Sequence, residues 1–92
     1  MCIRDSFVSE LHDSVKSNTG AAGFAALGIK DYYKRKGEPL KALPEIEQAL
    51  KSAKKQETRN VLLFTIRQIH EESKDHEAVY ETNKRLLNEN LN

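Results

Sequence analysis

The sequence predicts an all-α fold built from antiparallel helical hairpins. The residues with the highest helix propensity (Ala, Leu, Lys, Glu, Gln and Arg) dominate the chain of 92 residues. Apolar residues recur at the three- and four-residue spacing of a helix face, and no segment of strand length alternates with period two. The gaps between these segments are short and rich in turn-forming residues. Consecutive helices must therefore fold back on one another.

Composition and charge exclude several classes of partner. About a third of the residues are charged, with both signs interleaved and a formal net charge of +1. This balance is typical of a soluble surface and gives no electrostatic reason to bind nucleic acid or a membrane. No apolar run approaches the roughly 20 residues of a membrane helix. The single cysteine, Cys2, can form neither an internal disulfide nor a cysteine-based zinc site.

Residues 1–6 have an unusual composition for a protein start. They read MCIRDS, which resembles the translated end sequence of a transposase adapter used to tag DNA fragments. We interpret them as an artefact in a reading frame from a metagenomic assembly, and the alternative is a genuine unstructured N-terminus. On the first interpretation Cys2 has no function, the natural N-terminus is missing, and the localisation is unknown.

Residues 7–92 are expected to form a single helical domain of five helices. In residues 7–17 the apolar stripe is Val8, Leu11 and Val15, and the helix ends at turn-forming residues. We expect Asn18–Gly20 to belong to that turn. The remaining four helices are predicted at about residues 21–36, 39–55, 57–73 and 76–90.

Glycine and proline residues lead to specific expectations within these helices. Gly37 is expected to end the second helix, and the hairpins should turn near Gly37 and Lys74. Gly23 and Gly28 weaken a helix interior, so we expect a neighbouring helix to pack closely against them. For Pro44 two alternatives remain: the helix begins near Leu43 with Pro44 in its first turn, or the helix kinks there.

Residues 21–56 resemble a tetratricopeptide repeat, a two-helix unit of about 34 residues. The segment that carries the resemblance is GEPLKAL, residues 37–43. With Ala42 at the first small-residue position, the other family positions are taken by Ile29, Tyr33, Gly37, Ile46 and Ala49. The chain departs from the pattern at Ala26, Lys30 and Lys54. The register implies that Ala42 and Ala49 lie at close helix crossings.

Residues 57–92 can be aligned as a degenerate C-terminal capping unit. With Ala78 matching Ala42, Ser73 replaces the turn glycine, and Thr82 and Arg85 replace core residues. Residues 7–17 would then be the last helix of a truncated preceding unit. The resemblance implies a right-handed stack of about two repeats plus a preceding helix. The alternative is a generic helical bundle.

No motif indicates catalysis, a cofactor or a metal. Residues 19–24 read TGAAGF, which resembles the dinucleotide-binding loop of extended short-chain dehydrogenases. That loop needs a hydrophobic strand before it, and the preceding residues are polar and helical. The three histidines, His12, His70 and His76, lack metal-ligand spacing, and the adjacent Glu71 and Glu72 do not converge on a helix. We expect no enzyme activity, no cofactor and no metal.

The predicted function is a scaffold module that binds a protein or peptide and forms the C-terminal piece of a larger protein. In the family that the chain resembles, the first helix of each unit lines a concave groove. Carried over by position, Phe64 would be the apolar anchor and Arg67 the charged contact, unless Phe64 fills the core. The predicted groove residues are Leu27, Asp31, Lys34, Asn60, Leu63, Phe64, Arg67 and His70.

Two other functions stay open at this point. The chain could be a helical cap or oligomerisation tail of an enzyme whose catalytic part lies upstream. It could also be a self-contained bundle that self-associates, for which exposed repeat edges would provide the contact.

Overall fold

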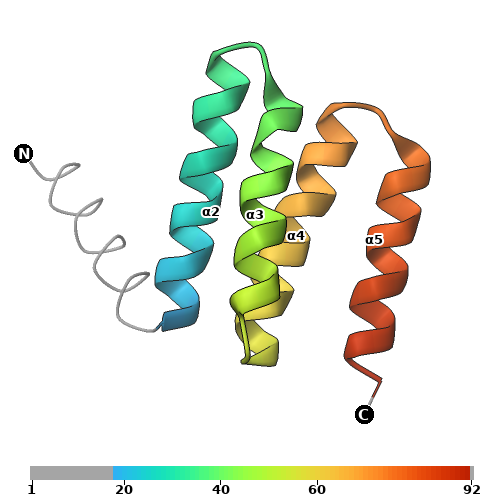
Figure 1. The fold of residues 1–92 in the computed structure, drawn as a ribbon. Helices are drawn as coiled ribbons and strands as arrows, with labels where there is room; N and C mark the ends of the chain where they lie inside the picture. Colours follow the sequence, from blue (N-terminus) through green and yellow to red (C-terminus); the bar gives the residue numbers. More distant parts are fainter. Residues whose placement is uncertain (1–17, 92) are drawn as a thin grey trace, which may run out of the picture.

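The computed structural model describes residues 18–91, which form four α-helices joined by tight turns (Figure 1). The helices are α2 (Asn18–Arg35), α3 (Ala42–Ser52), α4 (Gln56–Glu72) and α5 (His76–Glu89), and a short 3-10 helix, η1 (Pro39–Lys41), precedes α3. This range contains no strand, so the predicted all-α class is confirmed. Residues 1–6 and the helix expected at 7–17 lie outside the described residues. Within the described range, no helix is long and apolar enough to cross a membrane.

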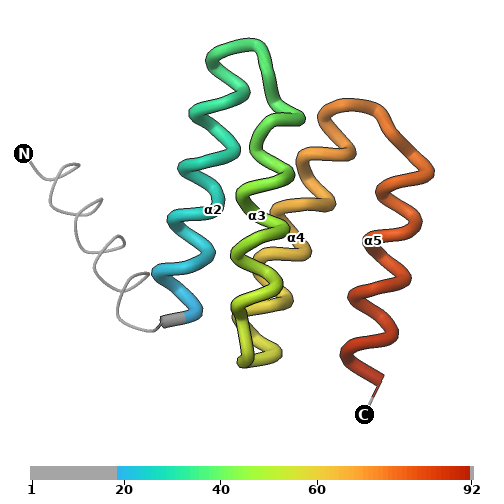
Figure 2. Tube along the Cα trace, in the orientation of Figure 1, coloured from blue at the N-terminus to red at the C-terminus, as the bar shows by residue number. Residues whose placement is uncertain are grey.

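Consecutive helices run antiparallel, as the trace in Figure 2 shows. Helices α2 and α3 form one hairpin, and α4 and α5 form the next. Helix α4 packs against all three of the other α-helices, and α2 packs more extensively on α4 than on α3. A helix that is contacted on several sides buries more than one face, which explains why α4 carries apolar residues around much of its circumference. These residues are Val61, Leu62, Leu63, Phe64, Ile66 and Ile69.

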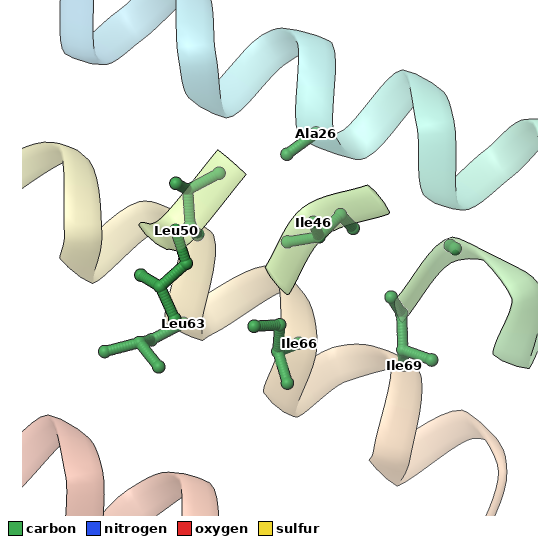
Figure 3. Close-up of a cluster of buried hydrophobic side chains, with 8 residues drawn as sticks. Ala26, Ile46, Leu50, Leu63, Ile66 and Ile69 are labelled. Atoms are coloured by element: carbon green, nitrogen blue, oxygen red, sulfur yellow. The ribbon is translucent and has the colours of Figure 1, made fainter. Parts of the chain in front are cut away.

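The hydrophobic core lies between α2, α3 and α4 (Figure 3). Helix α2 contributes a single small residue, whereas α4 contributes half of the buried set. The buried residues are Ala26, Ala42, Ile46, Leu50, Leu62, Leu63, Ile66 and Ile69.

The two alanines expected at helix crossings differ in burial. Ala42 is completely buried, as expected for a close crossing. Ala49 is exposed, so the prediction for this residue is wrong. Ala49 is rotated by only about 20° from Ala42 around α3, but it lies two turns farther along the helix, where it lines an open groove between α2 and α3.

Helices α2 and α4 end in the same type of turn. Gly37 and Lys74 both adopt a left-handed backbone, with φ of 76° and 59°. In each turn this residue and the next one donate backbone hydrogen bonds into the last helical turn: Gly37 to Lys34, Glu38 to Tyr33, Lys74 to Glu71 and Asp75 to His70. This pattern is the Schellman motif. The hairpins therefore turn where predicted, but Lys74 is the counterpart of Gly37. Ser73, which the sequence alignment placed there, still has right-handed backbone angles.

Helix α2 begins earlier than the sequence indicates. Asn18–Gly20, expected to form a turn, belong to the first turn of α2. A tertiary contact accompanies this start, because the hydroxyl oxygens of Thr19 and Thr58 lie 3.0 Å apart and join α2 to α4. Turn propensity is a property of neighbouring residues, so it does not reflect a contact between two helices.

The two glycines in the interior of α2 differ in how closely a neighbouring helix approaches them. A Cβ added at Gly23 would lie 3.6 Å from Val61, an ordinary van der Waals contact. At Gly28 no heavy atom among the described residues would lie within 4 Å. Among the described residues, the prediction of close helix packing is therefore wrong for Gly28. At Gly23 helix α4 does pack nearby, but the space would also hold a methyl group.

Pro44 follows the first of its two predicted alternatives. Helix α3 begins at Ala42, so Pro44 lies in its first turn. Backbone N–H groups of a first turn have no partner within the helix, and the missing N–H of proline therefore costs nothing there.

Candidate functional site

A shallow groove lies between α2 and α4 and contains two of the predicted site residues. This α2–α4 groove has a volume of about 210 Å³. It is lined by Gly23, Leu27, Val61, Phe64, Thr65 and Gln68. Leu27 from α2 and Phe64 from α4 are thus brought together from positions far apart in the sequence.

The rim of the α2–α4 groove is apolar and open to solvent. The exposed fractions of Phe64 and Leu27 are 56% and 43%. Phe24, one turn before Leu27 on the same side of α2, is 47% exposed. Large apolar side chains gathered beside a concavity are a common feature of sites that bind another protein. The exposure of Phe64 also answers one open question, because this ring does not fill the core.

Two predicted groove residues point elsewhere. Leu63 has no exposed surface and belongs to the core, so its assignment to a binding groove is wrong. Residues 63 and 64 are separated by about 100° around the helix, which turns Leu63 into the core while Phe64 faces solvent. His70 is half-buried, and its Nδ1 is buried without a hydrogen-bond partner among the described residues. Neither residue lines the α2–α4 groove.

Two further predicted residues of α4 connect it to α5. The Nε of Arg67 donates to Oδ1 of Asn83 at 2.8 Å, and Nη2 of Arg67 lies 3.1 Å from a carboxylate oxygen of Glu71. The side-chain amides of Asn60 and Asn90 exchange hydrogen bonds of 3.0 and 2.9 Å. Arg67 and Asn60 therefore stand beside Phe64 on α4, but their polar atoms are engaged with α5 or with α4 itself.

The predicted residues of α2 have different surroundings. Lys34 lies 3.5 Å from a carboxylate oxygen of Glu72 in α4, and Lys30 lies 3.1 Å from the same oxygen. Lys30 is buried, with an exposed fraction of 8%. Asp31 is exposed and borders an open surface with Tyr32 and Arg35, not the α2–α4 groove.

The ion pairs between α2 and α4 also lower the pKa of Glu72. Burial raises the pKa of the Glu72 carboxyl group, but the hydrogen bond and positive charge of Lys30, together with Lys34, outweigh burial and lower that pKa below its ordinary value. Glu72 therefore stays ionised and joins the two helices that form the walls of the groove.

Four residues that line the groove are absent from the sequence-based set. They are Gly23, Val61, Thr65 and Gln68. Helical spacing could have found three of them, because Gly23 precedes Leu27 by four residues, and Val61 and Gln68 lie three residues before and four residues after Phe64.

The segment that resembles a dinucleotide-binding loop is part of a helix. Residues 19–24 lie in the first two turns of α2. Residues 18–91 contain no strand that could position such a loop. Within the same range, no group of three or more His, Cys, Asp or Glu side chains gathers as metal ligands do.

No protein-family model, curated protein or solved structure matches this chain. No family is therefore assigned to it. The chemistry of the α2–α4 groove is the starting point for a functional proposal.

Proposed function

We propose that this chain is a scaffold module that binds a protein or peptide, and that the α2–α4 groove receives an apolar side chain of the partner. The observation that carries the proposal is the 56% exposure of Phe64 at the edge of this groove. An exposed aromatic side chain beside a concavity gains free energy when a partner covers it, and aromatic residues are enriched among binding hot spots.

The size of the groove supports a side chain as its occupant. Its volume of about 210 Å³ is below the roughly 300–1,000 Å³ of typical small-molecule pockets. Of its polar groups, the hydroxyl of Thr65 donates to the backbone carbonyl of Val61 at 3.0 Å. The exposed amide of Gln68 is left to orient a partner. This lining suits one apolar side chain of a partner, with a hydrogen bond from the partner to the amide of Gln68.

Polar contacts hold the two helices that form the walls of the groove, α2 and α4, in place. Lys30 and Lys34 connect α2 to Glu72 at one end of α4, and Arg67 connects α4 to Asn83 of α5. A groove that is formed before binding loses less conformational entropy when the partner arrives. These contacts therefore support recognition by a rigid surface.

The same proposal treats the two hairpins as units similar to tetratricopeptide repeats. Its support is an internal correspondence at a spacing of 36 residues: Ala26 and Leu62 are both buried, as are Ile46 and Thr82. Both hairpins also turn through a Schellman motif. Arg85 is exposed, which fits the polar outer face of a terminal unit.

Selection from a peptide library tests the proposal without knowledge of the natural partner. Peptides selected on the full chain should contain a large apolar residue. Their affinity, measured by calorimetry, should fall about tenfold or more for Phe64→Ala, in line with the loss of a hot-spot aromatic. The matched control is Tyr80→Ala, because Tyr80 is 59% exposed but lies on α5, outside the groove.

Two results would contradict the proposal. One is a set of selected peptides that bind Phe64→Ala as tightly as the parent chain. The other is an equal loss of affinity for Tyr80→Ala, which would indicate non-specific adhesion to exposed aromatic rings.

A further inference from the structure

A second groove lies between α2 and α3. This α2–α3 groove has a volume of about 320 Å³ and is lined mainly by short apolar side chains. Its floor belongs to the hydrophobic core, because Ala26, Ile46 and Leu62 line it and are buried. Its walls include Ala25 and Ala49, which are exposed. Since these two residues end in methyl groups, larger apolar side chains of a partner can reach the core surface between them.

The two ends of the α2–α3 groove differ in polarity. At the end nearer the turn at Gly37 lies Glu45, an exposed carboxylate that accepts a hydrogen bond from the hydroxyl of Tyr33. A carboxylate has further lone pairs and can accept a second donor. At the opposite end Ser52 and Thr58 line the groove with hydroxyl groups. The groove therefore suits an apolar occupant that carries a cation at one end only.

Helix α5 presents an exposed stripe with this composition. Tyr80, Lys84 and Leu87, which we call the α5 stripe, fall within about 60° of one another around the helix. Tyr80 and Leu87 are 59% and 60% exposed. The Nζ of Lys84 lies 5.4 Å from the centre of the Tyr80 ring. The positive charge is thus at the Tyr80 end of the stripe, and the Leu87 end is apolar.

The α5 stripe and the α2–α3 groove match in length. Tyr80 and Leu87 are seven residues apart, which corresponds to about 10 Å along a helix. Ile46 and Ala53, on the α3 side of the groove, are separated by the same number of residues. With α5 of one copy parallel to α3 of another, Tyr80 lies level with Ile46 and Leu87 lies level with Ala53.

Charge favours this parallel orientation. It brings the Lys84 ammonium group, which lies beside the Tyr80 ring, to the end of the groove that carries Glu45. The opposite orientation would bring this ammonium group toward Lys51, near the other end of α3. Opposite charges in contact fix the register of an interface, and like charges in contact oppose it.

A parallel contact of this kind already exists inside the molecule. Because consecutive helices are antiparallel, α3 and α5 run in the same direction (Figure 2). Helix α3 packs on α4, and Glu47 of α3 lies 3.4 Å from Arg85 of α5. Helix α3 therefore covers one side of the α4–α5 hairpin. Of the described helices, only α4 packs closely on α5. A second copy would supply the hairpin that follows α5, as α4 and α5 follow α3.

We propose that the α2–α3 groove of one copy receives the α5 stripe of a second copy of this chain. Because α2 and α5 lie at opposite edges of the molecule, each copy presents both surfaces at once (Figure 1). Association is therefore head-to-tail and continues beyond a dimer. A single helix face in one groove is smaller than the roughly 1,200 Å² of a standard interface, so the association is weak and reversible. The proposal depends neither on the α2–α4 groove nor on its partner.

Sedimentation equilibrium of the full chain tests the proposal. From micromolar to millimolar concentration, the average mass should rise past that of a dimer. Ala49→Glu places a charge in the groove and Leu87→Glu places one in the stripe, and each should leave the chain monomeric. Gln48→Glu and Leu40→Glu are the matched controls, because both positions are exposed and lie outside the groove and the stripe. If Ala49→Glu loses its helical circular dichroism, Ala25→Glu tests the same groove from α2.

Mixing the two blocked variants shows whether these two surfaces meet each other. The Ala49→Glu chain keeps an intact α5 stripe, and the Leu87→Glu chain keeps an intact groove. An equal mixture should form one-to-one dimers and nothing larger. A symmetric dimer through either surface alone would not produce this result, because one of the two variants would dimerise without the other.

A charge reversal tests the orientation. Lys84→Glu should weaken the association of the parent chain several-fold, because it places two carboxylates together at one end of the groove. Glu45→Lys in the same chain should restore the association by returning an opposite charge to the contact.

Three results would overturn the proposal. A parent chain that stays monomeric at millimolar concentration would leave the groove to a different occupant, such as a peptide of another protein. Association that stops at a dimer would indicate a symmetric contact. A mixture of Ala49→Glu and Leu87→Glu that stays monomeric while the parent chain associates would mean that the groove and the stripe do not meet.

Discussion

Arg59 and Glu89 form a two-pronged ion pair between the first turn of α4 and the last residue of α5. Nε and Nη2 of Arg59 donate to the two carboxylate oxygens at 2.8 and 2.9 Å. Nη1 donates to the backbone carbonyl oxygen of Leu50 at 2.8 Å, which brings the end of α3 into the same contact. One side chain therefore joins three helices at the end of the molecule opposite the two Schellman turns.

This contact predicts a loss of stability in acid. Hydrogen bonds from Arg59 and then Gln56 lower the pKa of Glu89 from 4.5 to about 2. Since the folded state binds the proton more weakly, the contribution is complete above pH 4.5 and is lost as the pH falls toward 2. Urea unfolding from pH 7 to pH 2 should show that Glu89→Gln removes on the order of 1–3 kcal/mol at pH 7 and flattens this part of the pH profile. Glu81→Gln, at an exposed position of α5, should leave both unchanged.

The left-handed turn residue Lys74 predicts a stabilising substitution. A non-glycine residue at positive φ costs roughly 1 kcal/mol because its Cβ crowds the backbone. Lys74→Gly should therefore raise the free energy of unfolding by about 1 kcal/mol, and Gly37→Ala should lower it by a similar amount. Thermal melts of both variants measure the effect. A destabilised Lys74→Gly would contradict the turn geometry.

The glycine at position 28 predicts a second gain in stability. The added methyl group of Gly28→Ala would meet no heavy atom of the described residues within 4 Å. Alanine should thus gain its helix propensity advantage of about 1 kcal/mol, which chemical denaturation can measure. Gly23→Ala should also be tolerated, since its methyl group makes only an ordinary contact with Val61. A loss of stability in Gly28→Ala would indicate that another segment packs on this side of α2.

The burial of Ala42 predicts an overpacking effect. Ala42→Leu inserts three carbon atoms where the present side chain has no exposed surface, and should cost about 1–3 kcal/mol. Gln48→Leu adds the same side chain at an exposed position of α3 and should change stability by less than about 0.5 kcal/mol. Equal melting temperatures for the two variants would contradict the packing of α3 on α4.

The four described helices were predictable because their apolar residues follow the helical period and their turns carry strong local signals. The predicted end of α2 at Gly37 and the position of Pro44 follow from backbone chemistry that is local to those residues. The start of α2 was not predictable in the same way, since the Thr19–Thr58 contact joins residues 39 positions apart.

The groove was predictable only in part, for a geometric reason. The apolar band of α4 indicates that more than one side is covered, but it does not say which side stays open. Leu63 and Phe64 are adjacent and similarly apolar, yet one is completely buried and the other is more than half exposed. Which of the two side chains is buried depends on where α2, α3 and α5 pack around α4. The identity of the two residues does not determine this.

The central position of α4 affects how the molecule unfolds. Helices α2 and α3 face core residues that α4 supplies, and α5 also packs on α4. Neither hairpin encloses a separate core, so neither can remain folded after the other has opened. We expect amide protons of α2 and of α4 to exchange with solvent through one shared global opening, because these two helices share the hydrophobic core. A break in the short connection between Ser52 and Gln56 would therefore leave two helical pairs that survive only while they stay associated.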